Sequence, residues 1–165
     1  MYDGRGVANF ILDYADNNNV VVTNLALQKL VYFCHAWFMV STGVPLVRHH
    51  FEAWEFGPVL PYLYRDFKHF GEKKIEGRAF KLDLNTGKKI VASIDLCSEK
   101  KVVLTDIVRF FSRLSARQLV DYSHVEGGPW HKVWNYEGKI NPGMKISNDE
   151  IVAFYSSQDR FYTLQ

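Results

Sequence analysis

The segment from Leu25 to Val40 limits what this chain can fold into more than any other part. Thirteen of its 16 residues are apolar, and the polar exceptions are Gln28, Lys29 and His35. A membrane span needs about 20 mostly apolar residues, so this segment is too short to be one. A helix that is apolar almost all round is typical of the centre of a domain, and we expect this one to be buried there.

The ends of this helix are marked by residues with known capping preferences. Thr23 or Asn24 can act as N-cap, and Gly43 followed by Pro45 stops a helix that runs to Thr42. Other helices are predicted where apolar residues recur at three- and four-residue steps or where a capping residue precedes them. They cover residues 6–16, residues 60–69, a stretch capped by Thr105, residues 116–124 after Ser115, a short helix from Pro129, and a last helix after Ser147.

Two segments are predicted to be extended. Residues 51–56 are short and aromatic, and a turn ends them. In residues 78–96, apolar residues alternate with polar ones on both sides of a Gly-containing loop, which predicts a β-hairpin. The chain is therefore expected to be an α+β, predominantly α-helical single domain over residues 1–165, with a short strand and a β-hairpin arm inserted at about residues 78–96.

The charges nearly cancel, with 20 Lys and Arg against 18 Asp and Glu, a formal net charge of +2. This balance disfavours a polybasic membrane anchor and a protein that binds nucleic acid mainly through its phosphates. Between Lys68 and Lys101, nine basic residues stand against five acidic ones, so the hairpin arm is basic on a slightly acidic body. Such a segment is usually a solvated face, and its alternative role is to steer an acidic partner.

Catalytic and metal-binding chemistry is not predicted. His49 and His50 are adjacent, and adjacent side chains on a strand point in opposite directions, so the pair chelates poorly. Neighbours on a helix point about 100° apart, so His35 cannot activate Cys34 as a base. An enzyme built on Cys97 and a histidine stays open as an alternative, but we expect no catalytic residue, no metal, no cofactor and no enzymatic activity. Only two cysteines in a chain of this size favour a reducing, cytoplasmic setting.

Several motifs, taken in order, point to one known family. Residues 27–33 read Leu-Gln-Lys-Leu-Val-Tyr-Phe, and residues 52–59 read Glu-Ala-Trp-Glu-Phe-Gly-Pro-Val. Residues 64–67, 115–122 and 128–130 add an aromatic pair, a helix begun by serine, and a proline–tryptophan pair. In their order and spacing these segments resemble the Panacea domain, the family that includes SocA-like antitoxins and the phage-associated GepA proteins.

The resemblance implies an antitoxin that neutralises its cognate protein toxin, encoded by an adjacent gene, through direct protein–protein binding. The alternatives it leaves are a proteolytic adaptor that delivers a toxin to an ATP-dependent protease, and a regulatory protein associated with phages or mobile elements. Neither a membrane nor nucleic acid is expected as a partner, and the oligomeric state is left open. No motif of the family carries over to the hairpin, whose role is therefore open as well.

A partner surface is expected around the motifs that carry the resemblance. It comprises Gln28, Lys29, Trp54, Phe56, Gly57, Pro58, Tyr62, Arg65 and Trp130. Gln28 and Lys29 either lie on the solvent edge of their helix or hydrogen-bond a partner or a neighbouring loop. The segment around Gly57 is either a turn locked by aromatic packing or an exposed aromatic ridge, because Trp and Tyr are favoured interface anchors. Of Trp130 and Trp134, one is expected in the core and the other at its edge.

Overall fold

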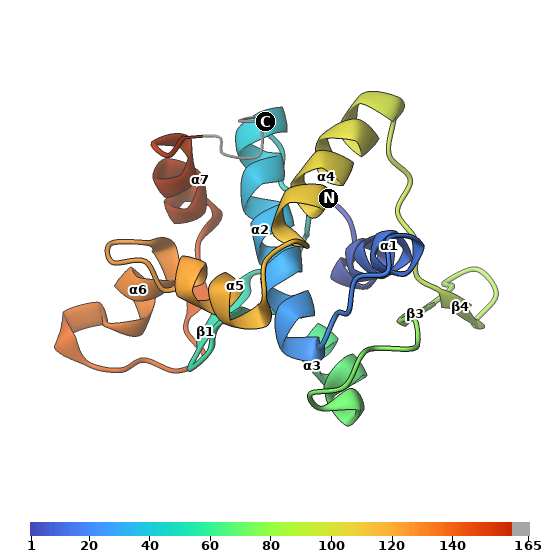
Figure 1. Ribbon diagram of the computed structural model, residues 1–165, viewed down its shortest axis with the longest axis horizontal. Coiled ribbons are helices and arrows are strands. Elements are labelled where there is room, and N and C mark those ends of the chain that lie inside the picture. Colours follow the sequence, from blue (N-terminus) through green and yellow to red (C-terminus); the bar gives the residue numbers. More distant parts are fainter. Residues whose placement is uncertain (160–165) are drawn as a thin grey trace.

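Helix α2 (Asn24–Thr42) forms the centre of the computed structural model, which describes residues 1–159 (Figure 1). The Thr23 side chain accepts a hydrogen bond from the backbone N–H of Ala26 and caps the helix. Gly43 ends it in the left-handed conformation, at φ 71°. Fifteen of its 19 residues are buried. Both ends and the central position that the sequence predicts are confirmed.

The other elements pack around α2 from several directions. Those in contact with it are α1 (Gly4–Asn17), β2 (Gly57–Val59), α3 (Pro61–Phe67), α4 (Ser98–Phe111), α5 (Ala116–Ser123) and α7 (Asn148–Ser156). In Figure 1, α7 flanks one side of α2, and α1 and α4 flank the other. The fold is α+β and predominantly helical, as expected. Within the described residues, no helix combines the length and the hydropathy that crossing a membrane requires.

A small antiparallel sheet lies against this helical assembly. Strand β1 (Phe51–Trp54) is central, with β2 on one side and β5 (Lys145–Ile146) on the other. The strand expected at residues 51–56 is confirmed over its first four residues, whereas β2 and β5 are too short for a two-residue period to reveal them. Pro58 is compatible with β2 because that strand lies at the sheet edge, where a missing N–H breaks no ladder bond.

The short elements follow the capping signals closely. A 3-10 turn, η1 (Lys68–Phe70), continues α3, and together they match the helix predicted at residues 60–69. Ser115 and Gln118 form a complete capping box at the start of α5. The last elements are α6 (Pro129–Trp134), which begins at Pro129 as predicted, η2 (Tyr136–Gly138), and α7, whose N-cap is Ser147.

The predicted start of α4 is wrong. The helix begins at Ser98, and Thr105 lies in its middle instead of capping it. The Thr105 hydroxyl donates to the backbone carbonyl of Lys101 at 2.8 Å, a bond to the residue four positions earlier that threonine can make inside a helix. The first turn of α4 is polar and mostly solvent-facing, and the fully buried residues of the helix start only at Leu104, which hid the true N-terminus.

Aromatic side chains of α2 fill much of the core. Phe33 stacks on Phe111 of α4 with ring centroids 4.5 Å apart, and Tyr155 of α7 meets Phe33 edge-on at 6.3 Å. Tyr32 meets Phe51 of β1 edge-on at 5.2 Å. Aromatic pairs in such geometries add about 0.5–1.5 kcal/mol each beyond the area they bury. One helix thereby joins α4, α7 and the sheet.

The β-hairpin is confirmed and lies at the end of the molecule opposite α6 (Figure 1). Its strands are β3 (Phe80–Leu82) and β4 (Lys89–Val91), with Phe80 opposite Val91 and Leu82 opposite Lys89. The pairing ends at Ala79 and Ala92, short of the predicted bound at residue 96, so from here on the hairpin arm means residues 78–92.

A buried amide of α1 fixes the base of the hairpin arm. Asn9 Nδ2 donates to the carbonyl oxygens of Ala79 (2.9 Å) and Ala92 (2.7 Å), and Asn9 Oδ1 accepts from the Ala79 N–H (2.8 Å). Arg78 Nε also donates to Asp13 Oδ1 of α1, at 2.8 Å. These bonds satisfy the backbone at the open end of the ribbon and hold it in one orientation against α1.

Replacing Phe111 by alanine tests the aromatic core. Phe111 is 1% exposed and stacks on Phe33, so Phe111→Ala leaves a cavity and is expected to lower the free energy of unfolding by about 3–5 kcal/mol. Urea unfolding followed by circular dichroism measures this. Tyr136→Ala, at a side chain that is 57% exposed, is the matched control and should change stability by less than about 0.5 kcal/mol. Equal effects of the two substitutions would contradict the packing described here.

Candidate functional site

Gln28 and Lys29, the two polar residues of the first family-like motif, both bind the segment that contains the second. Lys29 Nζ donates to the backbone carbonyl of Pro58 at 2.7 Å. Gln28 Oε1 accepts from the N–H of Leu60 at 3.1 Å, while Gln28 Nε2 donates to Asn24 Oδ1 at 3.3 Å. The side chains of α2 thus hold β2 and the residue after it in one register.

These bonds decide whether Gln28 and Lys29 lie at the solvent edge of their helix or hydrogen-bond another segment. Gln28 and Lys29 are 1% and 0% exposed, so the solvent-edge interpretation is wrong and the bonds go to a neighbouring segment of the chain. The physical reason is that β2 covers this side of α2, and its edge carbonyls need donors that an apolar helix does not otherwise supply.

Gly57 allows the close approach that these bonds require. Its φ is +99°, and a Cβ atom built on it would lie 2.5 Å from Ser123 Oγ and 2.9 Å from Lys29 Cε. Ser123 belongs to α5, so three elements meet at this glycine. We call the set Gln28, Lys29, Gly57, Pro58, Leu60 and Ser123 the junction.

The junction contains a buried amine without a carboxylate to balance it. Among the described residues, Lys29 forms no ion pair, and burial lowers its pKa to about 7 from the usual 10.5. Desolvation disfavours the charged form, and the single carbonyl of Pro58 offsets only part of that cost. At neutral pH the amine is therefore close to the midpoint of its titration.

Aromatic rings line the outer side of the junction. Trp130 Nε1 donates to the Trp54 carbonyl at 2.9 Å, and the Trp130 ring stacks on His124 at 3.7 Å. Trp130 is 6% exposed and Trp134 half-buried, as expected for a core and an edge position. Trp54 is itself half-buried, and its ring meets Tyr64 of α3 edge-on at 5.2 Å. Aromatic packing therefore locks the turn between β1 and β2.

The remaining predicted site residues lie farther from the junction or point away from it. Phe56, at the tip of the turn, is 59% exposed, and Arg65 is exposed on α3. Tyr62 instead anchors the start of α1, because its hydroxyl accepts from the Gly4 N–H at 3.0 Å and its ring lies 4.7 Å beneath Arg5. Burial raises the pKa of Tyr62 to about 12.

Cys34 and His35, the candidate nucleophile and base of α2, are both buried in the core. Burial raises the pKa of the Cys34 thiol. His35 Nδ1 accepts from the Val47 N–H at 3.1 Å, so Nε2 carries the proton and donates to Asn148 Oδ1 at 3.0 Å. Burial lowers the pKa of His35 to about 4, and the ring is neutral. Within residues 1–159, no group of three or more His, Cys, Asp or Glu side chains is placed to hold a metal ion.

Sequence reasoning missed Ser123, His124 and Asn9. The first two follow a regular helical pattern and become part of the site only because α5 folds back onto β2. Asn9 carried a usable signal, since it is a polar residue among the apolar positions of α1, and such a residue needs buried partners.

The fold and the site define a small helical domain in which one motif anchors another, and comparison with known proteins gives its family. Residues 27–131 match the family described as Antitoxin SocA-like, Panacea domain. The chain is also 41% identical over 160 residues to "Antitoxin SocA" of Caulobacter vibrioides (strain NA1000 / CB15N), across 96% of this chain and 82% of that relative. No solved structure matches. This chain belongs to the Antitoxin SocA-like, Panacea domain family, which confirms the resemblance carried by its motifs.

The buried amine predicts a pH-dependent stability. Between pH 7 and 10.5 the unfolded chain binds a proton at Lys29 that the folded chain does not, so stability rises with pH through this window, and the full penalty is present below it. Relative to Lys29→Met, the wild-type protein should gain about 2–3 kcal/mol in free energy of unfolding between pH 6 and pH 9. Urea titrations at both pH values measure the difference. Lys101→Met, at an exposed lysine of α4, should show no such change. An equal change in free energy of unfolding between pH 6 and pH 9 for wild type and Lys29→Met would contradict the prediction.

A second substitution tests the close approach at Gly57. Gly57→Ala must strain the backbone and displace Ser123 or Lys29, so it is expected to cost at least about 2 kcal/mol of stability. Gly43→Ala is the matched control, since Gly43 is also at a positive φ (+71°), in the left-handed region, but has no atom within 4 Å of a built Cβ. It should cost about 1–2 kcal/mol. Thermal unfolding of the two variants compares them directly, and an equal loss would show that contacts at Gly57 add nothing.

Proposed function

We propose that this chain is an antitoxin that neutralises a protein toxin by binding it directly. The observation that carries the proposal is the 41% identity to Antitoxin SocA over nearly the whole chain. The family match adds support because its range contains both halves of the junction. In this proposal the toxin is encoded by an adjacent gene and the complex forms in the cytoplasm.

The chemistry of the described residues supports a binding protein and not an enzyme. Cys34 is a buried neutral thiol, and both ring nitrogens of His35 are engaged within the core. Neutralisation by covering the toxin's active surface needs no group with a catalytic pKa. It needs a rigid surface, because a preorganised binder loses less entropy on association.

The predicted partner residues then divide into two roles. Gln28, Lys29, Gly57 and Pro58 position the turn between β1 and β2, and the rings of Trp54, Tyr62 and Trp130 support the surrounding surface. Phe56 and Arg65 are exposed, so we propose these two as contacts available to a partner.

Co-expression with the product of the neighbouring gene tests the proposal. That product should be toxic when expressed alone, and co-expression of this chain should restore growth and yield a complex on size-exclusion chromatography. Cys97→Ala should neutralise as well as wild type, because the exposed thiol has no role in steric binding. Persistent toxicity with no complex would refute the proposal. Loss of neutralisation by Cys97→Ala would favour the enzyme alternative.

The level of the toxin separates an inhibitor from a proteolytic adaptor. Direct neutralisation leaves the amount of toxin unchanged after synthesis is blocked, whereas an adaptor shortens its lifetime only where an ATP-dependent protease is present. A pulse-chase measurement with and without this chain distinguishes the two.

A further inference from the structure

We infer that the hairpin arm docks an acidic segment of the protein toxin on an apolar face formed by Phe80, Leu82 and Val91, which we call the arm face. This inference rests on the proposed function and names a surface that direct binding would use.

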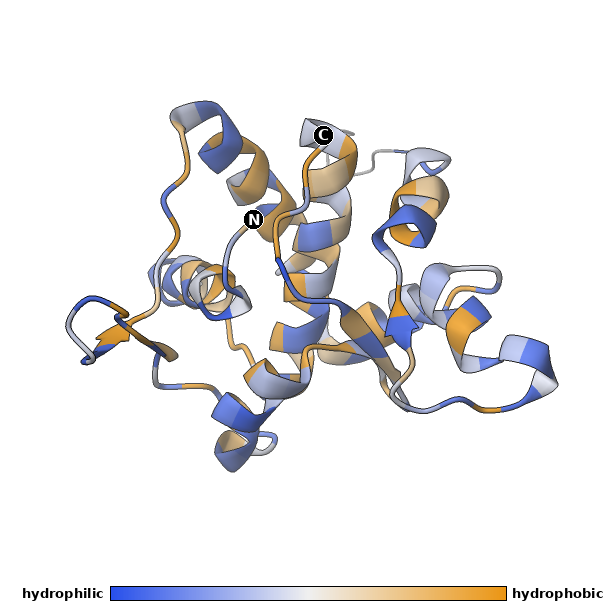
Figure 2. Cartoon of the chain, turned by 180° about the vertical axis from the view of Figure 1, so that it is seen from behind, coloured by the Kyte–Doolittle hydropathy of each residue, from blue (hydrophilic) through white to orange (hydrophobic). Residues whose placement is uncertain are grey.

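The arm face is apolar and open to solvent. Phe80, Leu82 and Val91 are 53%, 57% and 52% exposed, and Leu84 in the connecting loop is 91% exposed. In Figure 2, the hairpin lies at one edge of the molecule and carries apolar colouring between hydrophilic segments. Neighbouring exposed apolar side chains of this kind are typical of interaction sites.

The register explains why the arm does not bury this face. Phe80 is opposite Val91 and Leu82 is opposite Lys89, so these four side chains share one side of the ribbon. The other side carries the pair Lys81 and Ile90 and, at the base, Ala79 and Ala92, which are buried next to α1. The alternating apolar residues of β3 thus lie on the side that covers no core.

The lysines of the hairpin arm favour an acidic binding partner. Lys81, Lys88 and Lys89 form no ion pair with any residue of the range 1–159, and the one carboxylate of the arm, Asp83, bonds within the loop to Asn85 N (2.9 Å) and Thr86 Oγ1 (2.9 Å). If two copies of the chain associated through this face, the lysines of one copy would lie near those of the other, and this like-charge repulsion disfavours self-association here.

The strand edges favour a polypeptide over nucleic acid. Asp83 N donates to Lys88 O and Ala92 N donates to Ala79 O, so these residue pairs face each other. The alternate pairs, which contain Phe80 and Leu82, therefore direct their N–H and C=O groups outward. Open strand edges bind an added peptide strand through main-chain bonds, which nucleic acid cannot supply in the same pattern.

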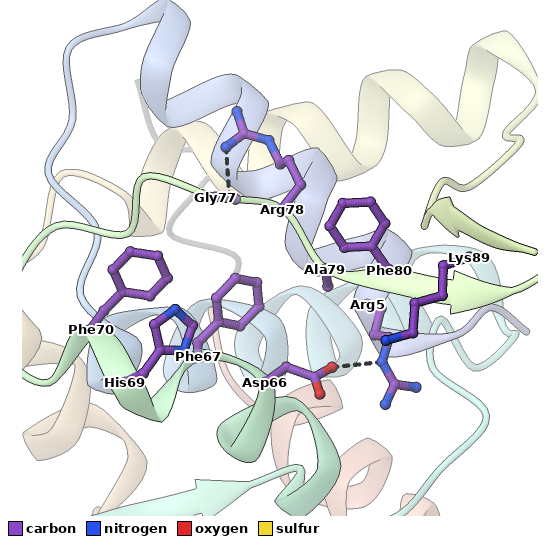
Figure 3. Close-up of a pocket in the computed structure, with 10 residues that line it drawn as sticks. All are labelled: Arg5, Asp66, Phe67, His69, Phe70, Gly77, Arg78, Ala79, Phe80 and Lys89. Carbon is purple, nitrogen blue, oxygen red and sulfur yellow. Dashed lines mark hydrogen bonds and ion pairs between the residues drawn. The ribbon is translucent and has the colours of Figure 1, made fainter.

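A pocket of about 500 Å³ borders the arm face. Figure 3 shows Phe80 and Lys89 on the hairpin side of this pocket and Phe67 and Phe70 on the side of α3 and η1. Arg5 crosses it to bind Asp66 at 2.6 Å. Aromatic walls with a free lysine at the rim suit an apolar side chain that is next to an acidic one.

The double variant Phe80→Ser/Leu82→Ser tests the inference with the neighbouring-gene toxin as the probe. Both residues are more than half exposed, so the variant should keep the wild-type unfolding midpoint while its affinity for the toxin falls at least about tenfold, measured by isothermal titration calorimetry. Lys88→Glu/Lys89→Glu should weaken binding as well, with a loss that shrinks at high salt. Val102→Ser/Ile140→Ser is the matched control and should bind as wild type does, because these side chains, in α4 and in the loop before β5, are 61% and 66% exposed and lie outside the arm.

The results distinguish a failure of the arm-face inference from a failure of the proposed function. If the wild-type chain binds the toxin and the arm variants bind equally well, the inference is overturned while the proposed function stands. If the wild-type chain itself neither binds nor neutralises, the proposed function fails and the inference falls with it. Self-association, or binding to duplex DNA, that the Phe80→Ser/Leu82→Ser variant abolishes without changing toxin affinity would assign the arm face to a different occupant and overturn the inference.

Discussion

A helix that is apolar on every side can be stable in water only if other segments surround it completely. Helix α2 sets this requirement, and helices from both ends of the chain together with strand β2 meet it. Aromatic pairs from α2 to α4, α7 and β1 then fix how the surrounding elements are oriented. The arrangement of the outer elements is therefore determined by the burial of α2 more than by contacts between the outer helices.

The junction solves a problem that complete burial creates. An edge strand laid against an apolar helix brings backbone groups into a place without water, where each unmade hydrogen bond costs about 1–3 kcal/mol. Gln28 and Lys29 supply an acceptor and a donor at adjacent positions, and Gly57 makes room for the lysine. A buried amine is an expensive donor, but it fixes one register of β2 and with it the aromatic turn that β2 carries.

The sequence predicts those features that depend on local chemistry. The ends of α2 follow from Thr23 and Gly43, and the hairpin follows from its two-residue period. The partners of Lys29 could not be predicted, because the carbonyl it binds is 29 residues away and carries no side-chain signature. The start of α4 was misplaced because a threonine hydroxyl bonds to the backbone both at caps and inside helices. β5 has only two residues and exists because β1 offers it an edge.

The attachment of the hairpin has a consequence for how such proteins diverge. The bonds that Asn9 and Arg78 make to α1 lie at the base of the ribbon, and the residues beyond Ala79 and Ala92 contribute little to the core. Substitutions, and even changes in loop length, can therefore accumulate there at small cost to folding. Selection on what the arm contacts can proceed separately from selection on the scaffold, so relatives that share the junction are free to differ in their arms.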